Sequence, residues 1–282
     1  MKSKEPENAL PEELLRHYES VQEARRLEEG ASRLEMARTR EILKRFLPPP
    51  PAVILDVGGG PGAHALWLAG LGYEVYLVDA VPRHVEQALE ASLRSPGPGI
   101  AGARVADARR LPQDDLTAHI VLLLGPLYHL TERAERVAAL SEARRVLRED
   151  GIVLAAAISR YASLLDGLFR GMLDDPRFAA IVVRDLLDGQ HRNPTERPDW
   201  FTTAYFHRPA ELKEEMEHAG LVHEATIGIE GPAWLLQNFE HNWAEPGRRD
   251  RLLAMMRAIE EAPEILGASA HLMAVGRRRP RR

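Results

Sequence analysis

The chain has 282 residues, of which 45% are hydrophobic and 28% are charged, so wholesale disorder and collagen-like repeats are excluded. Cysteine is absent, which excludes disulfide scaffolds, zinc ribbons and thiol nucleophiles. The net charge of −5 argues against a dedicated nucleic-acid-binding protein, which usually carries a basic excess. The sequence has no apolar run of about 18 residues and no apolar signal region near its start. We therefore expect a cytoplasmic protein.

The first part of the chain has a helical pattern. Apolar residues recur at helical spacing over 12–47, and Gly30 divides this stretch into two predicted helices. Four consecutive prolines then occupy 48–51. Because proline cannot continue a helix and extends the residue before it, these prolines predict a stiff linker. We interpret residues 1–51 as a helical lid followed by this linker.

Strand and helix patterns alternate through the central part of the chain. The predicted strands are 52–57, 74–78, 103–106, 119–124 and 151–158, and the predicted helices between them are 64–70, 85–93 and 132–147. Strands that alternate with helices indicate a parallel sheet with crossover helices. Residues 52–159 are therefore predicted to form an α/β core.

The alternation is interrupted over 160–208, which we interpret as an inserted cap for the acceptor. Two predicted helices, 164–172 and 178–187, are followed there by an irregular stretch rich in aromatic and histidine residues. Residues 209–276 then complete the core, and 277–282 are expected to be a loose basic tail. The predicted elements of this last part are helices at 209–219, 234–239 and 250–261 and strands at 222–229 and 270–275. The fold class is a doubly wound α/β sheet of seven strands, the last of them antiparallel.

A glycine-rich segment, I-L-D-V-G-G-G-P-G, stands between the first predicted strand and the first helix of the core. Glycines at this place allow a sharp turn and a close approach to a ligand, and the helix N-terminus offers free N–H groups. The segment fits a dinucleotide-binding pattern through Gly58, Gly60 and Ala63, with Asp79 at the distance of a ribose-binding acid. Asp56, however, would repel a pyrophosphate and attract a cation. A nicotinamide-dependent enzyme stays as the alternative interpretation.

Three acids, Asp56, Asp79 and Asp107, follow successive predicted strands around this glycine loop. Together with the loop they resemble the class I S-adenosylmethionine-dependent methyltransferases, and the resemblance covers about residues 53–158. It implies S-adenosylmethionine as the cofactor. It also implies that three glycines pass beneath the methionyl part of the cofactor, namely Gly58, Gly60 and Gly62.

The same resemblance implies roles for the side chains that follow the strands. Asp56 would anchor the amino group of the cofactor, and Asp79 would accept hydrogen bonds from the two ribose hydroxyls. Asp107 would accept one from the adenine amino group, with the backbone N–H of Ala108 close to the ring. Leu124, at the end of the fourth strand, would border the reactive methyl group.

Further site candidates come from the loop after the fourth strand, the lid and the cap. His129 is a candidate base, because imidazole titrates near neutrality; the alternative is a histidine that orders its own loop through a backbone hydrogen bond. On the lid, Tyr18 and Arg33 are candidates for contacts with the cofactor; the alternatives are a core aromatic and a solvated charge. The candidate acceptor-binding residues, some of which could simply pack the cap, are Tyr128, His129, Tyr161, His191, Trp200 and Tyr205.

The sequence thus predicts methyl transfer to a small organic acceptor at oxygen, nitrogen or an activated carbon. We expect no metal ion, because no cluster has a recognisable ligand spacing. We also expect no nucleic-acid or membrane partner. The alternatives are a methyltransferase that acts on RNA or protein and a protein that binds S-adenosylmethionine without catalysis.

Overall fold

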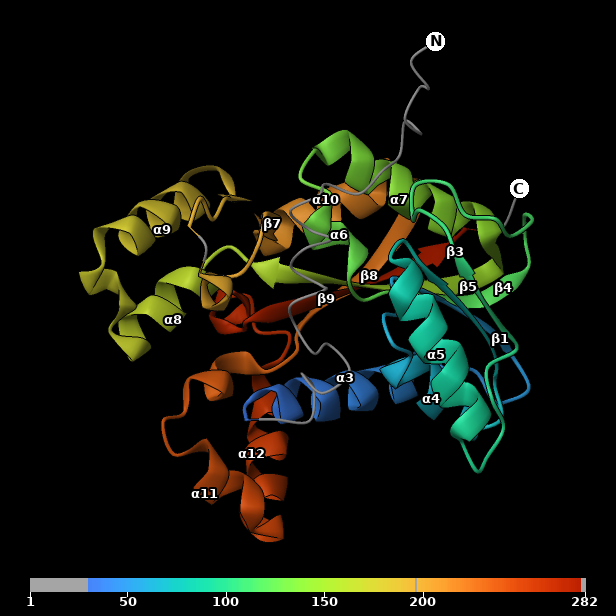
Figure 1. The fold of residues 1–282 in the computed structure, drawn as a ribbon, viewed down its shortest axis with the longest axis horizontal. Helices are drawn as coiled ribbons and strands as arrows, with labels where there is room; N and C mark the ends of the chain where they lie inside the picture. Colours follow the sequence, from blue (N-terminus) through green and yellow to red (C-terminus); the bar gives the residue numbers. More distant parts are fainter. Residues whose placement is uncertain (1–29, 196, 280–282) are drawn as a thin grey trace.

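The computed structural model describes residues 30–195 and 197–279 (Figure 1). Tyr18 and the first predicted helix lie outside the described residues. None of the helices in the described ranges combines the length and the apolar character that a bilayer crossing requires.

A mixed sheet runs through the middle of the protein (Figure 1). Its seven main strands have the order β3-β2-β1-β4-β5-β9-β8, and β9 runs antiparallel between β5 and β8. The predicted antiparallel last strand is therefore confirmed. Two short strands from the cap, β6 and β7, extend the sheet beyond the predicted seven, because β7 pairs with the end of β5. The strands are β1 (Val53–Val57), β2 (Glu74–Asp79), β3 (Gly102–Val105), β4 (Ala118–Leu123), β5 (Leu147–Ser159), β6 (Gln190–His191), β7 (Ala204–His207), β8 (Leu221–Gly228) and β9 (His271–Arg278).

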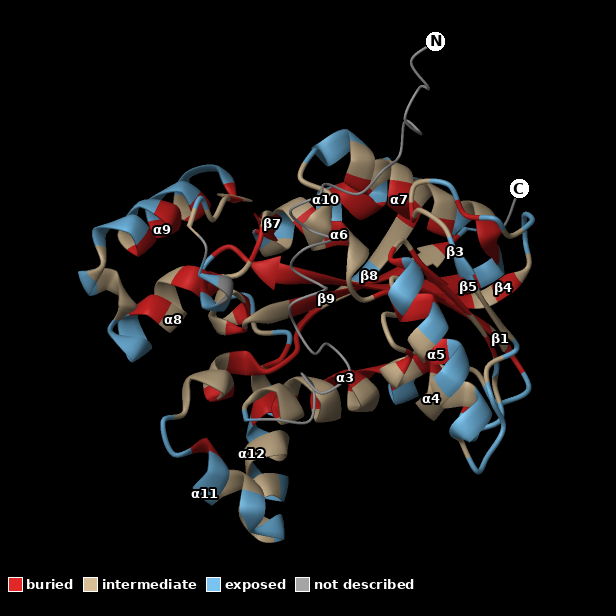
Figure 2. Cartoon of the chain, viewed as in Figure 1, coloured by how far each residue is buried: buried red, intermediate tan, exposed pale blue. Residues whose placement is uncertain are grey.

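Helices cover both faces of this sheet, as a doubly wound fold requires (Figure 1). In β4, Ile120 and Leu122 pack toward one face, and Val121 and Leu123 pack toward the other. This explains the continuous apolar runs in the sequence, because such strands are buried on both sides (Figure 2). The first face carries α3 (Ser32–Phe46), α4 (Ala63–Gly70) and α5 (Pro82–Arg94), and the second carries α7 (Arg133–Val146) and α10 (Pro209–His218).

The remaining helices belong to the loops and the cap, and one of the predictions for them is wrong. The predicted helix 234–239 is instead a short 3₁₀ helix, Gly231–Leu235, followed by α11. Its apolar pattern reflects tertiary contacts, since the Trp234 indole donates a hydrogen bond to the Ala268 carbonyl (2.9 Å). The other helices are α6 (Pro126–His129), α8 (Ala162–Arg170), α9 (Pro176–Asp188), α11 (Phe239–Ala244) and α12 (Pro246–Ile259), with 3₁₀ helices at Met172–Asp174, Pro198–Trp200 and Leu266–Ala268.

The prediction of a loose tail at 277–282 is wrong for its first two residues, which belong to β9. Arg278 donates hydrogen bonds to three carbonyls at the end of α7 and just beyond it, those of Arg144, Arg145 and Leu147 (2.6, 2.9 and 2.9 Å). A cation suits the negative end of a helix dipole. These two arginines are therefore structural, whereas residues 280–282 lie outside the described residues.

A buried ion pair joins α7 to α10 beneath the cap. The Arg136 guanidinium donates to the Glu215 carboxylate (2.6 and 3.0 Å), and both side chains are almost completely buried. Arg136 also donates to the Leu130 carbonyl (2.9 Å) and lies 3.6 Å from the centre of the Tyr205 ring. Glu215 bonds in addition to the His207 ring (3.2 Å). The pair therefore connects the cap strand β7 to the second layer of helices.

Removing the Glu215 carboxylate should destabilise the folded protein. Glu215→Ala leaves Arg136 buried without its counter-charge, so we expect the free energy of unfolding to fall by about 3–5 kcal/mol. Urea unfolding measures it. The matched control is Glu217→Ala on the same helix, where an exposed pair with Lys213 (3.8 Å) is worth about 0–1 kcal/mol. Equal losses for the two variants would contradict the prediction.

Candidate functional site

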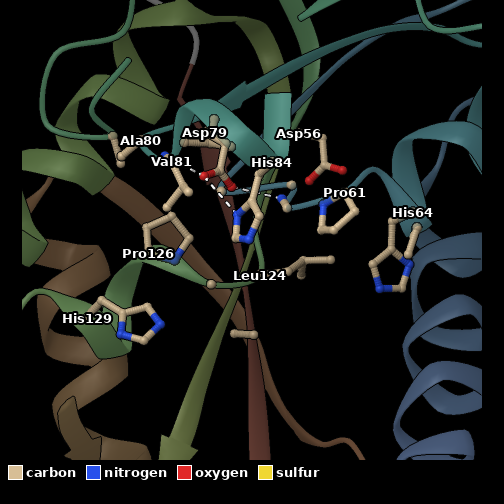
Figure 3. A pocket seen from close by; sticks show the side chains of 18 of the residues that line it. Asp56, Pro61, His64, Asp79, Ala80, Val81, His84, Leu124, Pro126 and His129 are labelled. Carbon is tan, nitrogen blue, oxygen red and sulfur yellow. Dashed lines mark hydrogen bonds and ion pairs between the residues drawn. The ribbon is translucent and has the colours of Figure 1, made fainter. Parts of the chain in front are cut away.

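A cavity of about 910 Å³ opens at the edge of the sheet where the parallel strands end. Its walls come from the loops that follow β1, β2, β3 and β4, from α3, and from the start of β9. The three predicted acids, Asp56, Asp79 and Asp107, all line it. In the view of Figure 3, His64 and His129 lie on opposite sides of the cavity. The volume is at the upper end of the ~300–1,000 Å³ typical of small-molecule sites.

The glycine loop forms one wall of this cavity through Gly58 and Gly60. Gly58 has φ +69°, and a Cβ atom there would lie 2.6 Å from the Pro126 ring, so only glycine fits. The Gly60 N–H donates to Asp79 Oδ2 (2.8 Å), which ties the loop to the end of β2. Gly62 caps the start of α4 with φ +92° and is not among the residues that line the cavity.

Asp56 is a buried acid whose carboxylate oxygens have no satisfying hydrogen bond among the described residues. Burial and the negative charge of Asp79 raise the pKa of Asp56 to about 7. The nearby backbone N–H of Ala65 lowers this pKa by less than the other two effects raise it. An uncompensated buried carboxylate is costly. A cation bound in the cavity would remove that cost, so the residue suits a positively charged ligand.

Asp79 and Asp107 are held in position by hydrogen bonds. Asp79 Oδ1 accepts from the Val81 N–H (2.8 Å) and faces the His84 ring (3.3 Å), as Figure 3 shows. Asp107 accepts from the backbone, Nε and Nη2 of Arg109 (2.7, 2.9 and 2.5 Å). Each carboxylate has about four acceptor positions, so these bonds orient both side chains and leave capacity for a ligand.

Arg40 lines the cavity from α3, and the sequence analysis missed it. Its Nε is buried and has no hydrogen-bond partner in the part of the chain that the structure describes, and burial lowers its pKa. Arg33, the predicted candidate, does not line the cavity; its guanidinium pairs with Glu240 and lies 5.6 Å from the Phe239 ring centre. The two arginines are seven residues apart on one helix and so share a face. That spacing was the signal available in the sequence.

The predicted acceptor residues divide into two groups. Tyr128 and His129 lie on α6 and line the cavity, as do Ala108 and Leu124. The other four candidates do not line the cavity. Tyr161 is exposed on the surface elsewhere. These four pack the cap instead: Tyr161 contacts Gly267, His191 bonds to the Asp185 carboxylate (2.9 Å), Trp200 packs on Phe178, and Tyr205 lies against Arg136.

Several polar residues reach the cavity that the sequence analysis did not select. They share no local motif, because they come from five different elements. Among them are Glu35 and Thr39 on α3, His64 on α4, His84 on α5, Glu135 on α7 and His271 at the start of β9.

Comparisons with known proteins show the family of the segment that forms this cavity. Residues 54–151 match a family described as a methyltransferase domain. Residues 54–151 are a class I S-adenosylmethionine-dependent methyltransferase domain. The predicted cofactor, S-adenosylmethionine, follows from this membership. No match was found among curated protein sequences.

Solved structures of this methyltransferase fold are similar along most of the chain. An S-adenosylmethionine-dependent methyltransferase from Methanosarcina mazei superposes with a TM-score of 0.59 at 17% identity, covering 85% of this chain and 98% of that one. A Thermotoga maritima methyltransferase, for which histamine N-methylation is suggested, gives 0.54 at 16%, covering 95% and 99%. A chain in the complex of the Haloferax volcanii Trm112 activator with a methyltransferase gives 0.55 at 14%, covering 89% and 94%. At these identities the likeness shows the fold.

The raised pKa of Asp56 predicts a pH-dependent stability. Because the pKa is 3.8 in the unfolded chain and about 7 in the folded protein, Asp56 destabilises the folded state progressively as pH rises from about 4 to 7. We expect Asp56→Asn to stabilise the ligand-free protein at pH 8 by up to about 4 kcal/mol, with a gain that disappears near pH 4.

Urea unfolding at pH 4, 6 and 8 measures this gain. The control is Asp114→Asn, because Asp114 is exposed, and its effect should not vary in the same way. A gain for Asp56→Asn that is independent of pH would contradict the prediction.

Proposed function

We propose that this methyltransferase transfers a methyl group to a small organic acceptor bound in the cavity beside the cofactor. The observation that carries the proposal is the uncompensated Asp56 carboxylate at the glycine loop. A second supporting observation is the size of the cavity, which extends from the ends of β1 and β2 to the start of β9 and so leaves room for a second molecule.

The cofactor contacts form part of the proposal. The amino group would bind Asp56 and the methionyl carboxylate would bind the half-buried Arg40, so that two side chains with buried, unpartnered atoms gain the opposite charge. Asp79 would accept the ribose hydroxyls, and Asp107 with Ala108 would hold the adenine. These assignments use side chains that line a single cavity.

Methyl transfer from a sulfonium depends more on how the acceptor is positioned than on acid–base catalysis. The cofactor supplies an electrophilic methyl group on a sulfonium, which leaves as a neutral thioether. The chain would hold the acceptor in line with the S–CH₃ bond and exclude water, and such orientation contributes much of a rate enhancement. Leu124 and Gly125 would border the methyl group, and Tyr128 and His129 would face the acceptor from α6.

A macromolecular acceptor is the second candidate, because one structural neighbour was solved in complex with the Trm112 methyltransferase activator. The basic C-terminus gives little support to a macromolecular acceptor, because Arg277 and Arg278 belong to β9 and bind other parts of the protein. Arg277 pairs with Glu224 and donates to the Asp150 carbonyl (2.8 Å).

Calorimetry with S-adenosylhomocysteine tests the cofactor site. Replacing Asp79 by Ala should weaken binding by about 1.5–3 kcal/mol, the cost of leaving charged hydrogen bonds unmade. Asp114→Ala, at an exposed position, should leave the affinity unchanged. Absence of binding to the unaltered protein at millimolar concentration would overturn the proposal.

A labelled methyl donor distinguishes the two acceptor classes. Incubation with methyl-labelled S-adenosylmethionine and a protein-free metabolite extract, supplemented with phenols, enols and amines, should put label into low-molecular-weight products. A parallel incubation with total RNA and protein should leave the macromolecular fraction unlabelled. Label in the macromolecular fraction alone would favour the second candidate.

A further inference from the structure

A buried carboxylate and a histidine form a hydrogen-bonded pair at the end of the cavity remote from β2. Glu230, two residues beyond β8, is only 2% exposed. Its Oε1 faces His271 Nδ1 (2.6 Å), and its Oε2 accepts from the His271 backbone N–H (3.0 Å) and from Ser269 Oγ (2.9 Å). The histidine lies at the first position of β9 and lines the cavity.

The hydrogen bonds around Ser269 fix the direction of its proton. Ser269 Oγ accepts the backbone N–H groups of Glu230 and Gly231 (3.1 Å each), so its own proton is left for the Glu230 carboxylate. An ionised carboxylate only accepts, and His271 Nδ1 therefore carries a hydrogen. In the neutral imidazole the other nitrogen, Nε2, is then the basic one.

Sheet topology explains how this pair reaches the methyltransferase cavity. Because β9 is antiparallel, its first residue lies at the edge where the parallel strands end, and His271 is paired with Ile158 of β5. Along the sheet, β9 is two strands from β4 and three from β1. At ~4.8 Å per strand, His271 is offset by roughly 10 Å from the end of β4, where Leu124 lines the cavity. That offset suits an acceptor molecule placed between them.

Two carboxylates lie close to the His271 ring. Glu230 lies behind the ring, and the Glu35 carboxylate on α3 lies within 4.8 Å of the pair. The nearest buried cation on α3 is Arg38, which donates to the Ile229 carbonyl (3.0 Å) and is paired with Glu41 and Glu260. The two carboxylates beside the ring would stabilise an imidazolium once a proton has been transferred.

We propose that His271 is the base of the methyl transfer and that the acceptor carries a hydroxyl group. This inference rests on the proposed function. As the acceptor oxygen bonds to the methyl carbon, the S–CH₃ bond breaks and its electron pair stays on sulfur. The hydroxyl proton passes to His271 Nε2 and later to solvent. Glu230 is a positioning residue, because it fixes the ring and its tautomer and does not touch the acceptor.

A cation site is the competing interpretation of the same side chains, since Glu35, Glu230 and His271 offer ligand atoms within 4.8 Å of one another. It is the weaker one, because both Glu230 oxygens already accept hydrogen bonds that a cation would have to displace. Calorimetry with Zn²⁺ and Mn²⁺ tests it. Binding at micromolar concentration that is lost in the Glu230→Gln and His271→Asn variants would overturn the proposed base.

The decisive variant is His271→Asn, whose amide nitrogen takes the place of Nδ1 and keeps the hydrogen bond to Glu230 while removing Nε2. With labelled donor and the supplemented extract described above, we expect initial rates to fall at least about 100-fold, the usual contribution of a general base. Affinity for S-adenosylhomocysteine should stay within threefold of the original. The residual rate should rise about tenfold per pH unit, because hydroxide then removes the acceptor proton. His218→Asn, an exposed substitution on α10, is the matched control.

Nuclear magnetic resonance of the imidazole nitrogens gives a readout that does not depend on activity. In the original protein we expect the neutral His271 ring to carry its proton on Nδ1, and in Glu230→Gln we expect the share of that tautomer to fall. Rates of His271→Asn within threefold of the original, a pH profile that does not change, or an N-methylated product would each overturn the inference. Failure of the proposed function itself would appear differently, as absence of cofactor binding in every variant.

Discussion

The site depends on one electrostatic constraint, the burial of Asp56 at the end of β1. A carboxylate that is 1% exposed and lacks satisfying hydrogen bonds is unfavourable in the ligand-free fold. Its surroundings are closely packed: a Cβ on Gly59 would lie 2.8 Å from Asp56 Oδ2, so the glycine loop lies directly against the acid. The fold is therefore destabilised at the point where we propose that the cationic amino group of the cofactor binds. Such local conflicts are typical of functional sites.

Two buried ion pairs hold the walls of the cavity on opposite sides of the sheet. On the first face, Arg38 of α3 pairs with Glu260 and donates to the carbonyl of Ile229, a residue that lines the cavity. On the second, the pair between Arg136 and Glu215 joins α7, α10 and the cap. Pairs of this kind contribute little net stability compared with apolar packing, but breaking one leaves a buried charge. They fix one arrangement of the walls, which preorganises the site for its ligands.

The parts that could be predicted from the sequence are those that local patterns encode. The first three strands of the core each have an acid at or just after their end, so the positions of Asp56, Asp79 and Asp107 followed from the alternation of strands and helices. The cap could not be treated in this way. Whether Trp200 or Tyr205 faces a ligand or a neighbouring side chain depends on partners far away in sequence, such as Arg136 for Tyr205. Aromatic content alone therefore predicted acceptor contacts that the described cavity does not include.

The pair formed by Glu230 and His271 shows what a fuller use of topology would have given. Both strands, β8 and β9, were predicted, and the last was expected to be antiparallel. In antiparallel neighbours the end of one strand lies beside the start of the next, and here Gly228 is paired with Leu272. Residues that follow β8 must then meet residues that begin β9, so an acid at 230 and a histidine at 271 are neighbours for reasons of register. The same argument places them at the edge where the cofactor loops converge. The position of His271 beside the cavity is thus determined by the order and direction of the strands, as the position of the glycine loop is determined by its sequence.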